Sequence, residues 1–548
     1  MANAEDKNPP TRGNDPQEPT QDFSAHHDDQ SKAFQPSDPY WLGPPPAPRR
    51  RRTPLVLAGI IGAAVLLAIG LVVGVTVGGE EDTEAADQQR ASNNTNEQPA
   101  GDNAAGAPAG GSGSGAGAGN AGAPAGSSGS GAGAGNAAPG GGSEFDLRNG
   151  SVFLQSNDPT NNEVVAFSRS ENGKLREVGR YETGGVGSGS FEDTSNGLVL
   201  GSPSGEASPQ HNLDSAQLLF VTNAGSNTVS VFRVNADNLE LVDTIASGGE
   251  KPVSLTVNRG LLYVLNSGEL DDRFILRFPD QFLDNCAHGE QPTVTGFRIS
   301  NEGDLSPLPN STRPISGGQE SGCAQVSFTP DGTKLMVTER LASLPQRPPD
   351  KGAIVTFEVS EGGQLGTKRI NDTSGVGPFG FGFAGDGTVL VTEQDHAEEG
   401  RGTASSYTML ENGEMKAVSK AVPTRETDTC WIVSTNDGRL AFASSALGSG
   451  AVSSFRIDDT GGLRLLHSSA SAPDGRDKEN DRLQDGNTDL SLSRDSKYLY
   501  QLNSHFGTLD VFRVNSDGKL SHIEEHKVFN VTLPENGGQL TPFGISAF

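Results

Sequence analysis

The sequence contains seven copies of one motif, in which a short strand-like run ends on an aromatic residue and is followed, after a turn, by Leu or Met. Successive aromatics lie 48 to 65 residues apart, a period typical of one propeller blade with some loop insertions. The copies therefore predict seven blades. Their aromatics are Phe167, Phe232, Phe297, Phe357, Tyr407, Phe455 and Phe512.

Each copy follows a second β-rich run, such as QLLFVTNAG, and six of these runs follow a third, such as CAQVSFTPDG. The Asp-Gly or Asp-Ser that ends most third runs favours a tight hairpin turn. The first copy lacks a third run, whereas the chain ends on TPFGISAF, which resembles the start of PFGFGFAGDG. We therefore expect Pro542 to Phe548 to add the innermost strand to the blade that begins at Ser151, because ring closure removes free sheet edges. The predicted fold class is all-β, a seven-bladed β-propeller over residues 147–548.

Three segments of different composition precede the propeller. Residues 1–52 are rich in Pro, Asp, Gln and Asn and are predicted to form a disordered cytoplasmic tail. Residues 53–79 carry no charge and are long enough for one transmembrane helix across about 30 Å of hydrocarbon. A cleaved signal peptide has an apolar core of only about 7–15 residues and is followed by an A-x-A cleavage site. This chain has a longer apolar segment and no convincing A-x-A site after it, so a signal peptide is disfavoured. A buried core helix is disfavoured because the flanks offer nothing to pack against.

The charges that flank the apolar segment predict its orientation. Four arginines, residues 49–52, precede it, and Glu80, Glu81 and Asp82 follow it. The positive-inside bias places the N-terminus in the cytoplasm and the propeller outside the cell or in the cell envelope. Residues 80–146 form a Gly/Ala/Ser-rich linker, and its residues 99–143, almost wholly Gly, Ala, Ser and Pro, are expected to be a flexible tether that spans roughly 40 Å.

Charge and cysteine content narrow the classes of partner. The net charge is −28, which argues against nucleic acid as a partner. In an exported domain, Cys286 and Cys323 could form a disulfide. Cys430 is expected to be buried as a small apolar side chain. The nine histidines are scattered without ligand spacing, so we expect no metal and no cofactor. We expect a monomer whose membrane contact is made by one helix.

Phrases such as LLFVTNAGSNTVSVFRV and VSFTPDGTKLMVTER resemble the lactonase-type seven-bladed propellers, a family that includes 6-phosphogluconolactonase and the fungal carboxymuconate-lactonising cyclase. The resemblance covers residues 151–548 and implies a site at the mouth of the central channel, where Arg holds an anionic substrate and His or Glu moves protons. It implies catalytic roles for Glu339, in VTER, and for His211, in SPQHNLD. Where the family tends to place Pro-Cys-His or Arg and His, this chain has Val253, Ser254, Ala324 and Gln325.

Propeller geometry predicts a polar ring on one face. The end of each second strand and the start of each first strand meet on the same side, so strand-end Asn and Glu side chains should surround one channel opening, with His211, Ser254 and Gln325 behind them. Such a ring could perform acid and base chemistry or bind a ligand, or its members could simply bond to turn backbones. The predicted substrate-binding residues are Arg340, Arg273, Asn223, Asn266, Glu393 and Asn503.

Two hypotheses follow. In the first, the protein is a membrane-anchored lactonase, a carboxylic-ester hydrolase, or a muconate-cyclase-like isomerase that acts on a lactone or carboxylated small molecule. It predicts a narrow polar pocket that holds Glu339 and His211, with Arg340 or Arg273 near enough to bind a carboxylate. In the second, a non-catalytic propeller binds a surface protein or glycan through its loops.

Overall fold

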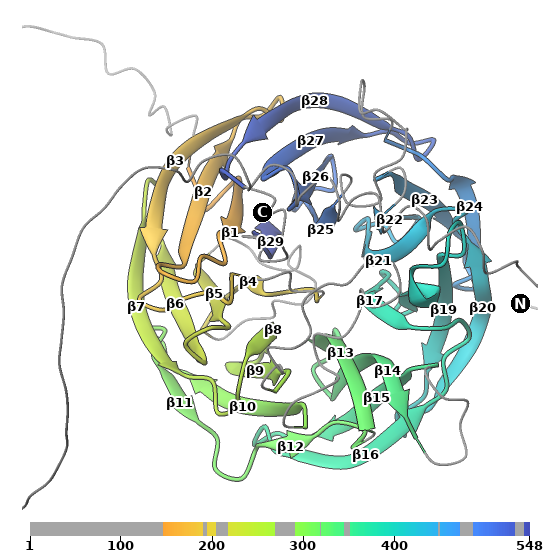
Figure 1. Cartoon of the computed structure of the whole chain (residues 1–548), viewed down its shortest axis with the longest axis horizontal. Coiled ribbons are helices and arrows are strands. Elements are labelled where there is room, and N and C mark those ends of the chain that lie inside the picture. Colours follow the sequence, from red (N-terminus) through yellow and green to blue (C-terminus); the bar gives the residue numbers. More distant parts are fainter. Residues whose placement is uncertain are drawn as a thin grey trace, which may run out of the picture. The chain divides into compact units, whose positions relative to one another are not determined.

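The computed structural model describes residues 146–189, 194–203, 217–268, 291–317, 319–344, 351–447, 450–471, 486–531 and 542–548. These residues form seven antiparallel sheets arranged around a common centre, as the sequence predicted (Figure 1). The described part of the chain is all-β apart from one short 3-10 turn, η2 (Asp395–Ala397). Residues 1–145, which include the predicted tail, membrane helix and most of the linker, lie outside the described residues.

Blades 1 to 4 are numbered in chain order, and their strands are given from the innermost to the outermost. Blade 1 contains β29 (Ile545–Ala547), β1 (Ser151–Gln155), β2 (Glu163–Arg169) and β3 (Leu175–Glu182). Blade 2 contains β4 (Leu198–Gly201), β5 (Leu218–Asn223), β6 (Thr228–Val234) and β7 (Leu239–Ala246). Blade 3 contains β8 (Pro252–Asn258), β9 (Leu261–Asn266), β10 (Thr293–Ile299) and an outer edge of β11 (Leu305–Pro307) and β12 (Arg313–Pro314). Blade 4 contains β13 (Gln319–Phe328), β14 (Lys334–Ser343), β15 (Ala353–Val359) and β16 (Leu365–Asn371).

Blades 5 to 7 repeat the same order. Blade 5 contains β17 (Pro378–Phe383), β18 (Val389–Glu393), β19 (Thr403–Met409) and β20 (Met415–Pro423). Blade 6 contains β21 (Thr427–Ser434), β22 (Leu440–Leu447), β23 (Val452–Ile457) and β24 (Leu463–His467). Blade 7 contains β25 (Asn487–Leu492), β26 (Tyr498–Asn503), β27 (Thr508–Val514) and β28 (Leu520–Lys527).

The C-terminal strand closes the ring. β29 pairs with β1 through Val152 with Ala547 and Leu154 with Ile545, which confirms the predicted closure. The backbone N–H of Phe548 donates to the carbonyl of Ser151 over 2.9 Å. Since β1 then has a paired strand on each side, it is not left as a free edge.

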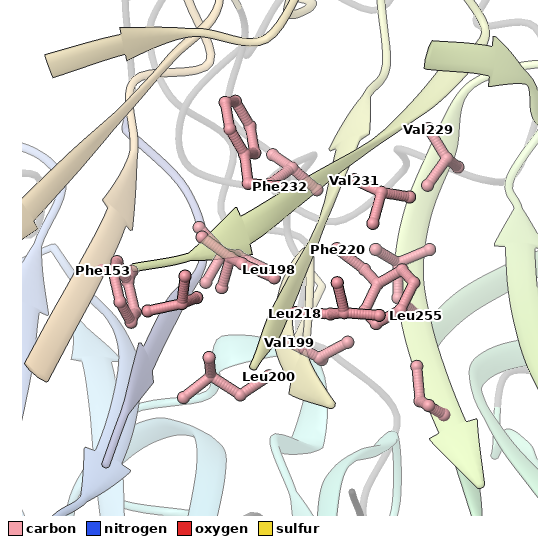
Figure 2. Packing of buried hydrophobic residues seen from close by; sticks show 14 of the residues in the cluster. Phe153, Leu198, Val199, Leu200, Leu218, Phe220, Val229, Val231, Phe232 and Leu255 are labelled. Carbon is pink, nitrogen blue, oxygen red and sulfur yellow. The ribbon is translucent and has the colours of Figure 1, made fainter. Parts of the chain in front are cut away.

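The core lies between the faces of neighbouring blades. Figure 2 shows one such region, in which Phe153 of blade 1, Phe220 and Phe232 of blade 2, and Leu255 of blade 3 belong to one buried cluster. The seven motif aromatics all lie on third strands and are buried. The outermost strands β3, β7 and β28 consist mainly of exposed and partly buried residues.

The ring has two faces, which carry opposite ends of the strands. The strand-end face is the one at which second strands end and first strands begin, and the turn face is the opposite one, which carries the turns between first and second strands and between third and fourth strands. The register pairs Pro252 with Asn266 and Pro378 with Glu393, which places these second-strand ends on the strand-end face.

Candidate functional site

The predicted polar ring lies on the strand-end face, but its side chains are buried. Asn223, Asn266, Glu339, Glu393 and Asn503 are at most 1% exposed. In blades 2, 4 and 5 the ring side chain hydrogen-bonds to the chain segment that arrives from the preceding blade. Asn223, Glu339 and Glu393 therefore each lie at a junction between two blades.

Asn223 forms the most complete of these junctions. Its Oδ1 accepts hydrogen bonds from Asn162 Nδ2 over 2.9 Å and from Thr183 Oγ1 over 2.7 Å, both in blade 1 or its exit. Its Nδ2 donates to Thr228 Oγ1 and Ser230 Oγ of blade 2. All four of these bonds are internal, so the amide is committed to holding two blades together.

The two carboxylates of the ring also accept hydrogen bonds from the segments that enter their blades. Glu339 accepts a hydrogen bond from the backbone N–H of Ser316 over 2.6 Å. Glu393 accepts from the N–H of Gly375 over 3.3 Å and from Thr403 Oγ1 over 2.7 Å. Ser316 and Gly375 both lie in the connection that enters the blade of the Glu, so each carboxylate anchors an incoming segment.

Glu393 differs from an ordinary surface carboxylate in its acidity. Burial raises the pKa of Glu393 to about 7, against the opposing effect of hydrogen bonds from Ser405, Thr403 and Gly375 and of the charge on Lys351. A carboxyl with a pKa near neutrality changes charge in the range where acid and base catalysis operates.

The remaining ring members bond within their own blade. Asn503 donates through Nδ2 to Asp510 Oδ2 over 2.7 Å and accepts at Oδ1 from Gln501. Asn266 donates to Thr295 Oγ1 over 3.5 Å. Arg340, which was predicted to hold a substrate carboxylate, is fully buried.

Small residues in the entering segments make these junctions possible. A Cβ at Gly185 would lie 2.5 Å from Cγ of Asn223, and a Cβ at Gly249 would lie 2.7 Å from Cγ of Asn266. The Gly-Gly pairs at residues 184–185 and 248–249 are visible in the sequence. They were the available signal that the neighbouring Asn side chains have a backbone pressed against them.

The residues expected behind the ring bridge blades as well. Gln325 of blade 4 donates to the carbonyl of Phe381 over 2.9 Å and accepts from the N–H of Phe381 over 2.8 Å. Ser254 Oγ of blade 3 accepts from the N–H of Val326 over 3.1 Å. Where the family tends to place reactive groups, this chain has side chains that mimic strand pairing between neighbouring first strands.

An axial segment, Thr194 to Asn196, connects blades that are distant in sequence. The carbonyl of Thr194 accepts from Trp431 Nε1 of blade 6 over 2.9 Å. The N–H of Ser195 donates to the carbonyl of Ala324 in blade 4, and the N–H of Leu255 in blade 3 donates to the carbonyl of Asn196. A segment bonded to three blades around the ring crosses the axis at the strand-end face. Sequence reasoning missed it.

Asp489 is a second group that the sequence analysis did not identify. It is 3% exposed, and its Oδ1 accepts from the N–H of Leu490 over 2.9 Å. Burial raises the pKa of Asp489 well above its usual value, and the backbone groups of Leu490, Ile545 and Asn196 oppose that rise. These backbone groups come from blades 7 and 1 and from the axial segment, so the carboxyl is positioned where three parts of the ring meet.

A small central cavity lies among the first strands of all seven blades. Its volume is about 90 Å³, whereas sites for organic ligands enclose roughly 300–1,000 Å³. Asn196, Gln325, Ser434 and Ser491 supply its polar lining, and Leu255 and Phe381 contribute to its apolar lining. No ionisable side chain is among the described residues that line it.

Several predicted residues lie outside the described part of the chain: His211, Arg273 and Cys286. The described strands that flank residue 211, β4 and β5, pair Gly201 with Leu218 at the turn-face end of their sheet, whereas Asn223 lies at the other end. Cys323 is disulfide-bonded, and Cys430 is free and buried. Within the described ranges, no group of His, Cys, Asp and Glu is placed to hold a metal ion.

Comparison with known proteins identifies the family. The model of the lactonase family, a seven-bladed β-propeller, matches residues 288–426 and 396–536. Over residues 288–536 the propeller therefore matches the lactonase-type seven-bladed propellers. No protein with curated function matches this lactonase-type chain.

Solved structures share its fold at low sequence identity. A candidate 6-phosphogluconolactonase from Bacteroides fragilis is 16% identical, with a TM-score of 0.50 over 75% of this chain and 100% of the other. A candidate 6-phosphogluconolactonase from Bacteroides uniformis is 13% identical, with a TM-score of 0.50 over 73% of this chain and 100% of the other. At these identities the likeness extends to the fold alone.

In the described residues of this lactonase-type propeller, no helix has the length and apolarity that a membrane crossing requires.

Proposed function

We propose that this protein is a membrane-anchored recognition protein, in which a non-catalytic lactonase-type propeller is displayed outside the cell by one transmembrane helix at residues 53–79. The apolar, uncharged composition of that segment and the arginines before it support the anchoring and the orientation. The Gly/Ala/Ser-rich residues 80–146 give the propeller reach without a fixed orientation. A recognition domain that must find a partner at variable distance benefits from such a tether.

The observation that carries the non-catalytic proposal is the use of polar side chains on the strand-end face. Asn223, Glu339, Glu393 and Gln325 form hydrogen bonds with a neighbouring blade or with the segment that enters their own blade. An acid or base catalyst must instead reach a substrate atom within about 3 Å. The axial segment and the central cavity of about 90 Å³ leave little room for a lactone at the axis.

A second candidate function is lactone hydrolysis or isomerisation, and one observation favours it. The pKa of Glu393 is raised to about 7 by burial, which suits a general base or acid at neutral pH. Membership of the lactonase family supports the same candidate. In that case, the connection that covers Glu393 would have to move before the carboxylate could meet a substrate.

A lactone panel distinguishes the two candidates. We would assay the full chain in detergent micelles with aliphatic, homoserine and sugar lactones, beside Glu393→Gln, Glu339→Gln and His211→Ala. The recognition proposal predicts no turnover above the buffer rate in the parent or in any variant. Turnover in the parent that is lost in one of these variants, with the thermal unfolding midpoint unchanged, would establish an enzyme.

A further inference from the structure

A groove on the turn face is far larger than the central cavity. Its volume is about 800 Å³, against about 90 Å³ at the axis. Turns from three consecutive blades form its walls. They are residues 329–334 of blade 4, residues 385–389 and 408–411 of blade 5, and residues 459–460 of blade 6.

The groove begins at the central channel. Phe383 lines both the central cavity and the groove. It is 5% exposed and packs edge-on against Phe381, with ring centroids 5.9 Å apart. Val389 and Met409 belong to or pack against the same apolar cluster, so the floor is a firm hydrophobic surface.

The walls are held in shape by hydrogen bonds inside the turns. Asp331 accepts from the N–H of Thr333 over 3.0 Å and from Thr329 Oγ1 over 2.6 Å. Asp386 accepts from the N–H of Thr388 over 2.9 Å. A groove whose rim is already ordered loses little conformational entropy when it binds a ligand.

The charge of the groove's rim is mainly negative. Asp331, Asp386, Glu411 and Asp459 line the groove and are exposed, while Lys334 is its basic residue among the described lining. Carboxylates around a concave surface raise the local concentration of cationic groups and fix their register. An apolar floor under an acidic rim is complementary to a chain that alternates apolar and basic side chains.

We propose that this turn-face groove binds an extended basic segment of a partner protein, with an apolar side chain against Phe383 and Lys or Arg side chains beside Asp386, Glu411 and Asp459. This inference rests on the proposed recognition function and names its site and partner chemistry. The groove is distinct from the strand-end face, so binding there leaves the blade junctions intact.

The test uses two matched triple variants of the full chain in detergent micelles. The first, D386N/E411Q/D459N, removes three carboxylates from the groove, and Asn at 386 can still accept the turn hydrogen bond. The second, E171Q/D495N/D517N, removes the same charge from turns of blades 1 and 7. The probes are a fluorescein-labelled hexapeptide of alternating Lys and Leu and its alternating Glu and Leu counterpart.

Fluorescence anisotropy measures the affinity of the parent and of each variant for each of the two peptides. We expect the Lys–Leu peptide to bind the parent and the blade 1 and 7 triple variant alike, and to bind the groove triple variant about tenfold more weakly. A single variant, Thr408→Arg, should reduce binding by blocking the groove, because Thr408 is exposed in its wall. No binding to the parent, equal loss in both triple variants, or equal binding of the Glu–Leu peptide overturns the proposal.

Hydrogen exchange with the peptide bound separates failure of the groove from failure of the recognition function. Protection at residues 384–389 and 408–411 is the expected result. Protection on the strand-end face instead would overturn the groove and leave the recognition function standing. Lactone turnover by the parent, measured on the same sample, would overturn the recognition function whatever the peptide does.

Discussion

The strand-end face and the turn face of this propeller use polar residues in opposite ways. On the strand-end face, Asn223 and Glu393 are fully buried and bonded across blade junctions. On the turn face, Glu411 and Asp459 are exposed beside a groove of about 800 Å³. The contrast teaches that a polar residue at a strand end of a propeller can be part of its framework, while the hairpin turns are free to meet a partner.

Replacing Asn223 tests that contrast most severely. Asn223→Ala removes four hydrogen bonds across and within blade 2 and leaves one buried N–H of the Asn162 amide without its acceptor. We expect a loss of about 4 kcal/mol in the free energy of unfolding, measured by urea titration of tryptophan fluorescence. Asn235→Ala, which removes one exposed Asn–Asn bond, is the control and should cost less than about 0.5 kcal/mol. Equal losses would remove the distinction between junction and surface.

The buried Glu393 should make the free energy of unfolding depend on pH. Burial raises its pKa to about 7 from a usual value of 4.5. The folded state therefore holds more protons than the unfolded state between these values, and stability falls as the pH rises from 4.5 through 7. We expect a fall of about 3 kcal/mol over this window in the parent, and a flatter profile in Glu393→Gln. Parallel profiles from chemical unfolding at pH 4.5 to 8 would contradict the buried, titrating carboxyl.

The axial segment should depend on Trp431. Trp431→Phe keeps an aromatic ring beside Phe379, whose ring centroid lies 5.2 Å away, but removes the bond to the carbonyl of Thr194. We expect a loss of about 2 kcal/mol. Hydrogen exchange should accelerate at residues 194–196 more than in β2. A uniform acceleration across the blades would show that the segment has no separate attachment.

The turn-face groove should show the smallest effect on stability. Glu411, Asp459 and Asp386 are exposed, so D386N/E411Q/D459N should change the free energy of unfolding by less than about 0.5 kcal/mol, while it weakens binding of the Lys–Leu peptide. A loss as large as that of Asn223→Ala would mean that these carboxylates also hold the fold together.

The sequence was sufficient for the blades and for ring closure. Phe232 lies on β6 and Leu239 begins β7, as the spacing of the motif predicted, and Ile545 pairs with Leu154. Period-two patterning and turn residues are local signals, so they can be read without contacts. Strand-end residues could also be placed on one face, since that follows from the repeat.

The candidate site was harder to predict from the sequence, because its hydrogen bonds join residues that are far apart in the chain. Thr194 meets Trp431, and Gln325 meets Phe381, across separations that no local pattern encodes. The axial segment has no periodicity and was not foreseen. Asp489, the one carboxylate in the buried strand NTDLSL, is the sequence signal for a buried carboxyl group at this position. The roles assigned to His211 and Arg273 stay predictions, since both lie outside the described residues.

The most direct test of the account measures lactone turnover and the pH profile of unfolding on the same samples of parent and Glu393→Gln. The account predicts that neither protein turns over a lactone and that the parent loses about 3 kcal/mol more stability than Glu393→Gln as the pH rises from 4.5 to 7. Turnover in the parent that disappears in Glu393→Gln, with identical unfolding profiles, would contradict it and place catalysis at the strand-end face.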